Sequence, residues 1–307
     1  MLVLLALVLA VLVAGGVWLY TPDLPRGTLE ARYLSSAADL RWVAGVRLHV
    51  RVSGPEDAPA VVLLHGFGSS LHTWEPWAEL LAATHRVIRF DLPGFGLTGP
   101  DPTGDYSDGR SVAVLAALLD QLGVGRASIV GNSLGGKIAW HFAVRHPART
   151  DRLVLISPDG FASPGFEYGK RTSVPPVMRL LPHVLPEPLL RMSLAPAYAN
   201  PATLTDATVT RYRDLMRAPG VRQAILARTE QVMLQDPEPL LRRIEAPTLL
   251  LWGEKDAMIP FRNAADYLRI MPHATLAALP GLGHVPFEEA PSSSFEPVRA
   301  FLAAGRR

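Results

Sequence analysis

The chain has 307 residues, of which 49% are hydrophobic, and it contains no cysteine. This absence excludes disulfide frameworks, thiolate nucleophiles and cysteine–zinc sites. The 30 basic and 28 acidic residues leave a formal net charge of +2. Because no long run of basic residues occurs, the charge pattern gives no indication of nucleic-acid binding.

The chain opens with an apolar segment. Residues 2–20 carry no charged side chain, and as a helix they would measure about 28 Å, close to the hydrocarbon thickness of a bilayer. Trp18 and Tyr20 stand where an aromatic belt would meet the interface, and the GGVWLY sequence around them is a poor cleavage context. We therefore expect residues 1–20 to form a single-pass membrane anchor. The alternatives are a cleaved signal, which would give a secreted or periplasmic protein, and a soluble core helix.

Residues 21–40 contain two prolines and scattered charges without a clear period. This pattern predicts a linker or extended arm. Alternating apolar and polar residues at 46–52, preceded by 41–43 and Gly45, then predict an antiparallel hairpin.

Short apolar runs alternate with helical patterns along the rest of the chain. The runs are typical of strands buried on both faces, and they lie at 60–64, 87–90, 128–130, 153–156, 248–252 and 275–279. The helical patterns lie at 74–83, 111–122, 134–145, 261–271 and 295–304. This alternation predicts an α/β fold with a mostly parallel central sheet and helices on both faces.

One long interval breaks the alternation. About 90 residues separate 153–156 from 248–252, and a structureless loop of that size is rare in a compact domain. Their helical periodicity predicts an inserted helical cap over the carboxyl ends of the strands, where open sheets bind ligands. We therefore expect a core of residues 41–157 and 247–307, with the cap at 158–246.

The chemistry starts where the run at 128–130 is followed by GNSLGG. A G-x-S-x-G sequence between a buried strand and a helix is typical of a sharp turn that exposes a serine hydroxyl above the sheet. The helix N-terminus also places backbone N–H groups near developing negative charge. The pattern therefore predicts Ser133 as a nucleophile.

A serine nucleophile needs a base, and that base needs an orienting carboxylate. Of the nine histidines, His284 lies in a glycine-rich loop after the last expected strand, so it is the predicted base. Asp256 ends the turn after the strand at 248–252 and is the predicted orienting acid. Glu254 and Asp159 are the alternatives.

Backbone donors for an oxyanion are expected after the strand at 60–64. The glycines of HGFG let the chain turn an N–H inward, so the N–H groups of Phe67 and Leu134 form the predicted oxyanion hole. We expect His65 to brace this loop and Asp91 to structure the loop that it begins.

Five motifs resemble those of α/β hydrolases with a helical cap, in the same order and over about residues 41–305. They are HGFG at 65–68, DLPGFG at 91–96, GNSLGG at 131–136, WGEKDAMIP at 252–260 and GLGHVPFEEAP at 281–291. The resemblance implies the same nucleophile, acid and base, Ser133, Asp256 and His284. It also implies that no metal or organic cofactor is needed.

The resemblance leaves the reaction open. Dehalogenase and epoxide hydrolase members use an aspartate nucleophile, where this chain has Ser133. Hydrolases of C–C bonds in ring-cleavage diketones usually carry a proline and a tryptophan where this chain has Ser69 and Val285. We therefore expect carboxylester hydrolysis. The alternatives, in order, are C–C hydrolysis, cofactor-free perhydrolase or haloperoxidase chemistry, and a non-catalytic ligand-binding protein.

The expected partner is a small-molecule ester with an apolar acyl group. We expect the cap methionines to pack between cap helices, and the alternative is that these flexible side chains line an adaptable apolar acyl site; they are Met178, Met192, Met216 and Met233. The expected anchor indicates lipid-derived esters such as monoacylglycerols.

Overall fold

The computed structural model describes residues 1, 4–5, 9, 15–16, 19–162 and 167–304. Most of the expected anchor at 1–20 therefore lies outside the described residues. Within the described part of the chain, no helix has the length and apolar character needed to cross a membrane.

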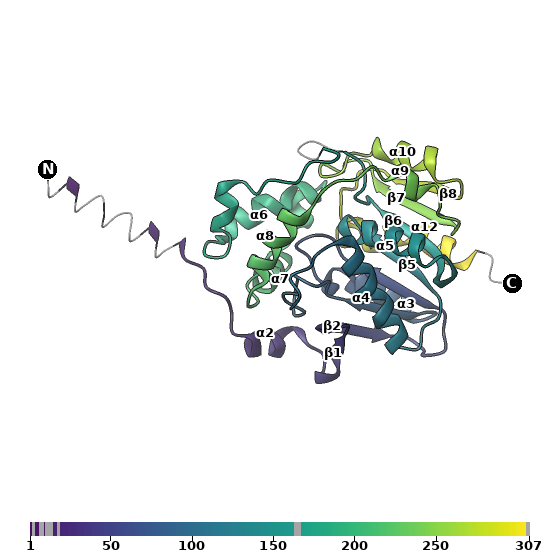
Figure 1. Ribbon diagram of the computed structural model, residues 1–307, viewed down its shortest axis with the longest axis horizontal. Helices are drawn as coiled ribbons and strands as arrows, with labels where there is room; N and C mark the ends of the chain where they lie inside the picture. The colour runs from purple at the N-terminus through teal and green to yellow at the C-terminus, as the bar shows by residue number, and fades with distance from the viewer. Residues whose placement is uncertain (2–3, 6–8, 10–14, 17–18, 163–166, 305–307) are drawn as a thin grey trace.

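An eight-stranded sheet forms the centre of the protein (Figure 1), in the order β1-β2-β4-β3-β5-β6-β7-β8. The strands are β1 Leu40–Val43, β2 Val46–Ser53, β3 Ala60–Leu64, β4 Arg86–Phe90, β5 Ala127–Asn132, β6 Thr150–Ile156, β7 Thr248–Gly253 and β8 Ala274–Leu279. Within this sheet, β1 pairs with β2 and β2 with β4 in antiparallel orientation, and the other five pairings are parallel. The expected hairpin and the mostly parallel sheet are confirmed.

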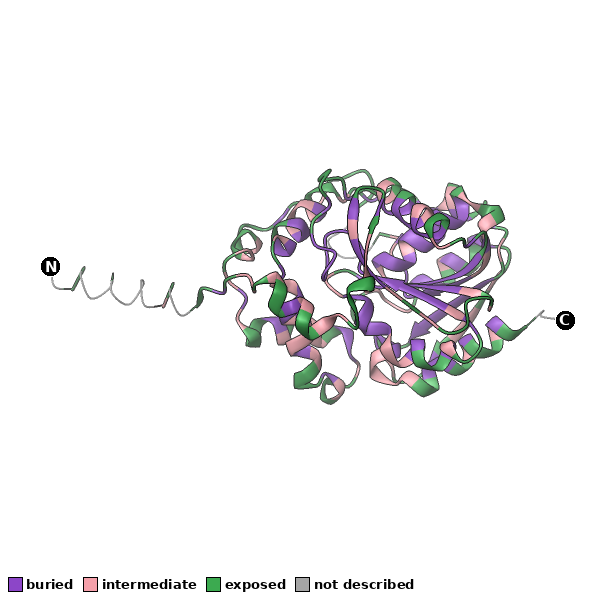
Figure 2. Ribbon diagram, turned by 90° about the horizontal axis from the view of Figure 1, so that it is seen from below, coloured by how far each residue is buried: buried purple, intermediate pink, exposed green. Residues whose placement is uncertain are grey.

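Helices cover both faces of the sheet. They are η2 Leu71–Trp74, α3 Glu75–Ala82, α4 Asp108–Gln121, α5 Leu134–Arg145, η3 Pro147–Arg149, α10 Asn263–Ile270, α11 Pro286–Glu289 and α12 Pro291–Ala303. Because successive side chains of a strand point to opposite faces, Val61 and Leu63 pack in one core with α3 and α12. Val62 and Leu64 pack in the other core with α4, α5 and α10. Both cores are buried between layers (Figure 2), and the fold class is confirmed.

The segment between β6 and β7, which we call the cap, is helical. It contains η4 Pro176–Leu180, α6 Glu187–Leu194, η5 Ala195–Ala197, η6 Pro201–Thr203, α7 Asp206–Met216, α8 Val221–Gln231 and α9 Glu238–Leu241. Its residues contact the loops that follow β3, β4 and β8, so it lies over the carboxyl ends of these strands. Met192 and Met233 are exposed, which contradicts the expectation that they pack between cap helices.

The segment expected to be a linker at 21–40 is folded. It forms α2 Arg26–Tyr33 and η1 Ala37–Asp39. Only Leu29 of α2 is buried, so the helix lacks the apolar periodicity that would have predicted it. Polar contacts rather than apolar packing hold α2 against the cap. Arg32 and Tyr33 both donate to Asp214 of the cap, the latter over 2.9 Å.

Candidate active site

Ser133 is the single residue that connects strand β5 to helix α5. β5 ends at Asn132, α5 begins at Leu134, and Ser133 itself has φ 52° and ψ −119°. A Cβ on Gly131 would lie 2.3 Å from the carbonyl oxygen of Gly135, and a Cβ on Gly135 would lie 2.2 Å from that of Leu64. Only glycine fits at these two positions, which explains the glycines of the motif. The backbone strain is stored at the residue that carries the candidate nucleophile.

Asp256 and His284 meet although 27 residues separate them in sequence. The Oδ2 atom of Asp256 lies 2.7 Å from Nδ1 of His284, and both side chains are buried. The other carboxylate oxygen accepts the N–H groups of Met258 over 2.8 Å and Ile259 over 2.9 Å. One oxygen is therefore fixed by the backbone while the other faces the imidazole, an arrangement that sets the ring orientation and tautomer.

The alternative acids lie elsewhere. Glu254 is exposed on the turn after β7. Asp159 is nearer, because its backbone N–H donates to the carbonyl of Ser133 over 3.1 Å. Burial raises the pKa of the Asp159 carboxyl, which opposes the charged form that an orienting acid needs. The position next to Nδ1 of His284 is taken by Asp256.

The loop that carries His284 is held from two sides. Nδ2 of Asn132 donates to the carbonyls of His284 over 3.0 Å and Ile156 over 3.1 Å. From the cap, the carbonyl of Ala197 accepts the N–H groups of His284 over 2.8 Å and Val285 over 3.3 Å. Sequence reasoning missed Asn132, although a polar residue at the end of a buried strand was a usable signal.

We expect Asn132→Ala to lower both stability and turnover. The substitution removes the donor that Asn132 gives to the carbonyl of His284, and loss of a buried hydrogen bond of this kind typically costs about 1–3 kcal/mol. The carbonyl of Ile156 still accepts the N–H of Ser133, so the main effect is to free the His284 loop. Urea unfolding and ester turnover measure the two effects. Asn263→Ala, at a buried asparagine of α10, is the control and should leave kcat unchanged; equal kcat losses in both variants would refute the positioning role.

The loop after β3 is braced by His65 as expected. Nε2 of His65 accepts the N–H of Leu92 over 2.9 Å, so the proton resides on Nδ1, which donates to the carbonyl of Gly66 over 2.8 Å. Burial lowers the pKa of His65 and keeps the ring neutral. Phe67, one of the two predicted oxyanion donors, follows in this loop. Leu134, the other, opens α5, where the first N–H groups have no partner within a helix.

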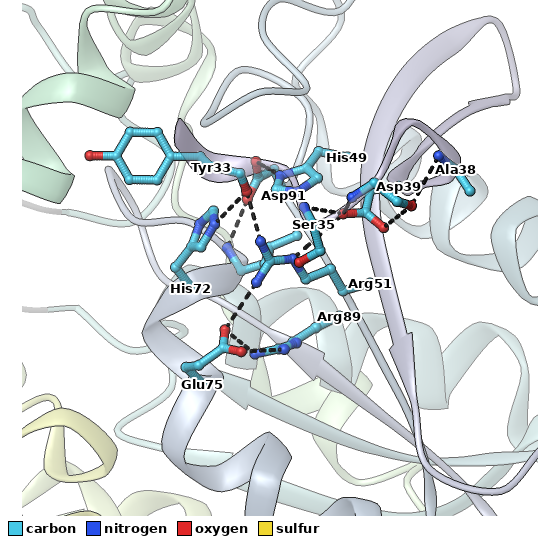
Figure 3. Close-up of polar contacts among 12 residues, drawn as sticks. Tyr33, Ser35, Ala38, Asp39, His49, Arg51, His72, Glu75, Arg89 and Asp91 are labelled. Carbon is cyan, nitrogen blue, oxygen red and sulfur yellow. Dashed lines mark hydrogen bonds and ion pairs between the residues drawn. The ribbon is translucent and has the colours of Figure 1, made fainter. Parts of the chain in front are cut away.

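Asp91 is buried next to this loop and fixes the backbone of the segments around it (Figure 3). Its carboxylate accepts the N–H groups of Leu71 over 2.7 Å and Leu97 over 2.8 Å, and it lies 2.8 Å from Nδ1 of His49. Burial alone would raise the pKa of the Asp91 carboxyl, but attraction to His49 and the hydrogen bond with it hold that pKa well below its usual range. The expected role of Asp91 in structuring the loop is confirmed.

Figure 3 also shows how α2 reaches this network. The carbonyl of Tyr33 accepts from Nε2 of His72 over 3.1 Å and from Arg51 over 2.7 Å. Burial lowers the pKa of His72 to about 4, so the ring is neutral near pH 7. Glu75 binds Arg89 through two hydrogen bonds of 2.7 and 2.9 Å. The end of α2 is thus tied to the segment that follows the predicted oxyanion loop.

We expect Asp91→Asn to destabilise the fold by about 3–5 kcal/mol at pH 7, as loss of one partner of a buried pair does. Because the folded pKa of Asp91 is depressed, its contribution is present above the unfolded pKa of about 4 and is lost as the pH falls toward the folded value. Urea unfolding from pH 7 to pH 3 should show the difference between wild type and variant shrinking below about pH 4. A difference that stays constant over this range would contradict the assignment.

Comparison with known proteins places the chain in a family. Residues 59–291 match the sequence profile of the family described as alpha/beta hydrolase fold. The chain therefore belongs to the α/β-hydrolase family, and it is an enzyme of the hydrolase class.

Its relatives include two hydrolases of unsaturated 2-hydroxy-6-oxo acids. A 2-hydroxy-6-oxo-6-phenylhexa-2,4-dienoate hydrolase of Burkholderia cepacia is 28% identical over 251 residues, covering 80% of this chain and 87% of the relative. A 2-hydroxy-6-oxononadienedioate/2-hydroxy-6-oxononatrienedioate hydrolase of Comamonas testosteroni is 29% identical over 258 residues, with the same coverage. Among solved structures, a membrane phospholipase A described as a bacterial virulence factor is 28% identical, covers 97% of both chains and has a TM-score of 0.74.

Proposed function

We propose that this protein is a serine hydrolase of carboxylic esters that uses Ser133, His284 and Asp256. The observation that carries the proposal is the 2.7 Å contact between Nδ1 of His284 and a buried, backbone-fixed Asp256. This pair is tied through Asn132 to the strained turn at Ser133. A hydroxyl on such a turn, a base and an orienting carboxylate are the parts that acyl transfer requires.

The proposed reaction has two halves. Ser133 Oγ attacks the ester carbonyl while Nε2 of His284 takes its proton, and the negative charge of Asp256 stabilises the imidazolium that forms. The N–H groups of Phe67 and Leu134 would bind the oxyanion. The alkoxide then leaves with the proton from His284, and a water molecule activated by His284 releases the acid from the acyl-enzyme.

C–C bond hydrolysis is the second candidate, because the two relatives are named as hydrolases of unsaturated 2-hydroxy-6-oxo acids, which contain no ester bond. Ser69 and Val285 still separate this chain from the pattern expected of that group. The hydroxyl of Ser69 lies 3.2 Å from that of Tyr212 in the cap, a contact that a proline could not make. Ester hydrolysis therefore remains the first candidate.

The proposed substrates are lipid-derived esters such as monoacylglycerols, with residues 1–20 acting as a membrane anchor. The uncharged sequence of residues 2–20 supports the anchor. The likeness to a membrane phospholipase A, which extends over 97% of both chains, supports it further.

A turnover panel tests the proposed reaction. The full chain in detergent is assayed with esters of increasing acyl length and with a ring-cleavage dienoate. We expect ester cleavage to be the faster reaction and to favour apolar acyl groups. Faster C–C cleavage would replace the first candidate by the second, and failure to turn over either class would refute both candidates.

A further inference from the structure

Two successive elements of the cap, η4 and α6, expose apolar side chains. Val177 and Leu180 of η4, with Leu189 and Met192 of α6, are between 54% and 71% exposed. We call these four residues the cap apolar patch. Grouped apolar exposure of this kind is typical of a surface that meets a partner or a membrane.

The patch is not needed to pack α6 onto the cap. Leu190 is the buried residue of this helix and already supplies its inward contact. Leu189 and Met192 are three residues apart, so they lie on a common face of the helix, and that face is exposed. α6 is therefore apolar toward solvent as well as toward the interior.

The N-terminal segment enters the fold directly beside the patch. Tyr20 forms an antiparallel bridge with Val184, and the N–H of Thr21 donates to the carbonyl of His183 over 2.7 Å. Both cap residues lie in the short connection between η4 and α6. Figure 1 shows α6 on the side of the molecule where this segment arrives.

The residues where the N-terminal segment joins the fold, Thr21 to Asp23, are bound to the cap by a buried arginine. Arg222 of α8 is fully buried and donates to Asp23 over 2.6 Å and to the carbonyl of Thr21 over 2.7 Å. Arg222 also donates to the carbonyl of Leu181 over 3.3 Å, next to Leu180 of the patch. The patch therefore lies close to the point where the N-terminal segment joins the fold.

Arginine side chains lie near the same place. A cavity of about 320 Å³ beside Tyr20 is lined in part by Arg213 and Arg217, together with Glu187. Arg179 lies between Val177 and Leu180 in η4, with its side chain 65% exposed and 3.6 Å from Glu230. Apolar side chains with arginines around them match a bilayer interface that contains anionic headgroups.

We infer that the cap apolar patch lies on the surface of the lipid bilayer, next to the point where the N-terminal segment leaves the bilayer. This inference rests on the membrane anchor of the proposed function and goes beyond it, because an anchor alone could hold the enzyme at any distance or orientation. With the patch at the headgroup level, the cap over the candidate active site touches the phase that contains lipid esters.

The absence of native cysteine makes the test direct. The full chain is prepared with Val177→Cys or Met192→Cys, labelled with an environment-sensitive fluorophore, and reconstituted in phosphatidylcholine and phosphatidylglycerol vesicles with or without nitroxide lipids. Trp42→Cys is the control, because Trp42 of β1 is 67% exposed and lies on the edge strand of the sheet. Apolar faces of interfacial helices lie about 5–10 Å below the headgroup boundary, so the two patch labels should shift to the blue and be quenched. The control label should not.

The outcomes separate this inference from the proposals on which it rests. If the chain floats with the vesicles but the patch labels behave like the control, the inferred contact between the patch and the bilayer is wrong, while the membrane anchor is supported. If the chain does not float, both are wrong, while ester turnover in detergent still decides the reaction. A blue shift that follows the protein-to-lipid ratio without nitroxide quenching would show a second copy on the patch, which also overturns the inference.

Discussion

Replacing Ser133 by alanine is expected to lower kcat for ester hydrolysis by about 10⁶-fold, as loss of a serine nucleophile does in other serine hydrolases. The substitution removes the attacking oxygen and nothing that the fold requires, because the strained turn depends on Gly131 and Gly135. Steady-state turnover of an activated ester, with thermal unfolding in parallel, measures the effect.

The control for this variant is Ser157→Ala. Ser157 directly follows the neighbouring strand β6, also has a positive φ, of 40°, and is fully buried. Because it shares the backbone strain of Ser133 but, unlike Ser133, is not partly exposed, its alanine variant should retain ester turnover. Activity of Ser133→Ala near the wild-type level would show that the nucleophile lies elsewhere.

Asp256→Asn is expected to reduce kcat by about 10⁴-fold with little change in KM for a small ester, as substitution of the orienting aspartate does in a Ser-His-Asp triad. The amide has no negative charge to stabilise the imidazolium, and it no longer selects the tautomer with the proton on Nδ1 of His284. The variant should stay folded, since an amide oxygen can still accept from Met258 and Ile259.

Asp159→Asn distinguishes the two aspartates that the sequence left open. Asp256, and not Asp159, lies against Nδ1 of His284, so a neutral amide of the same shape at Asp159 should change kcat little. The comparison uses the same ester and the same pH for both variants. A larger loss in Asp159→Asn than in Asp256→Asn would assign the orienting role to Asp159.

The parts of the structure that the sequence predicted are those with local signals. Buried strands show as short apolar runs, and the turn at Ser133 shows as glycines that no other residue can replace. The loops of Asp256 and His284 follow strands, so their meeting at one edge of the sheet follows from the parallel topology. The geometry of that meeting, including the 2.7 Å contact, required the structure.

The missed features depend on polar or backbone contacts between distant segments. α2 buries only Leu29 and is attached through side chains such as Arg32 and Tyr33, so no periodic pattern marks it. The cap holds His284 through the carbonyl of Ala197, a group that every residue type possesses. Met192 was expected inside the cap because methionine suits apolar sites, yet helix periodicity alone does not say which apolar face is covered.

Labelling with a fluorophosphonate tests the central claim most directly, because the reagent reacts with an activated serine. The full-length wild type, Ser133→Ala and Ser157→Ala are treated alike, and the modified peptide is located by mass spectrometry. The account predicts one phosphonylated residue, Ser133, in the wild type and in Ser157→Ala, and no labelling in Ser133→Ala. Labelling that persists in Ser133→Ala, or a wild type that does not react, would contradict it.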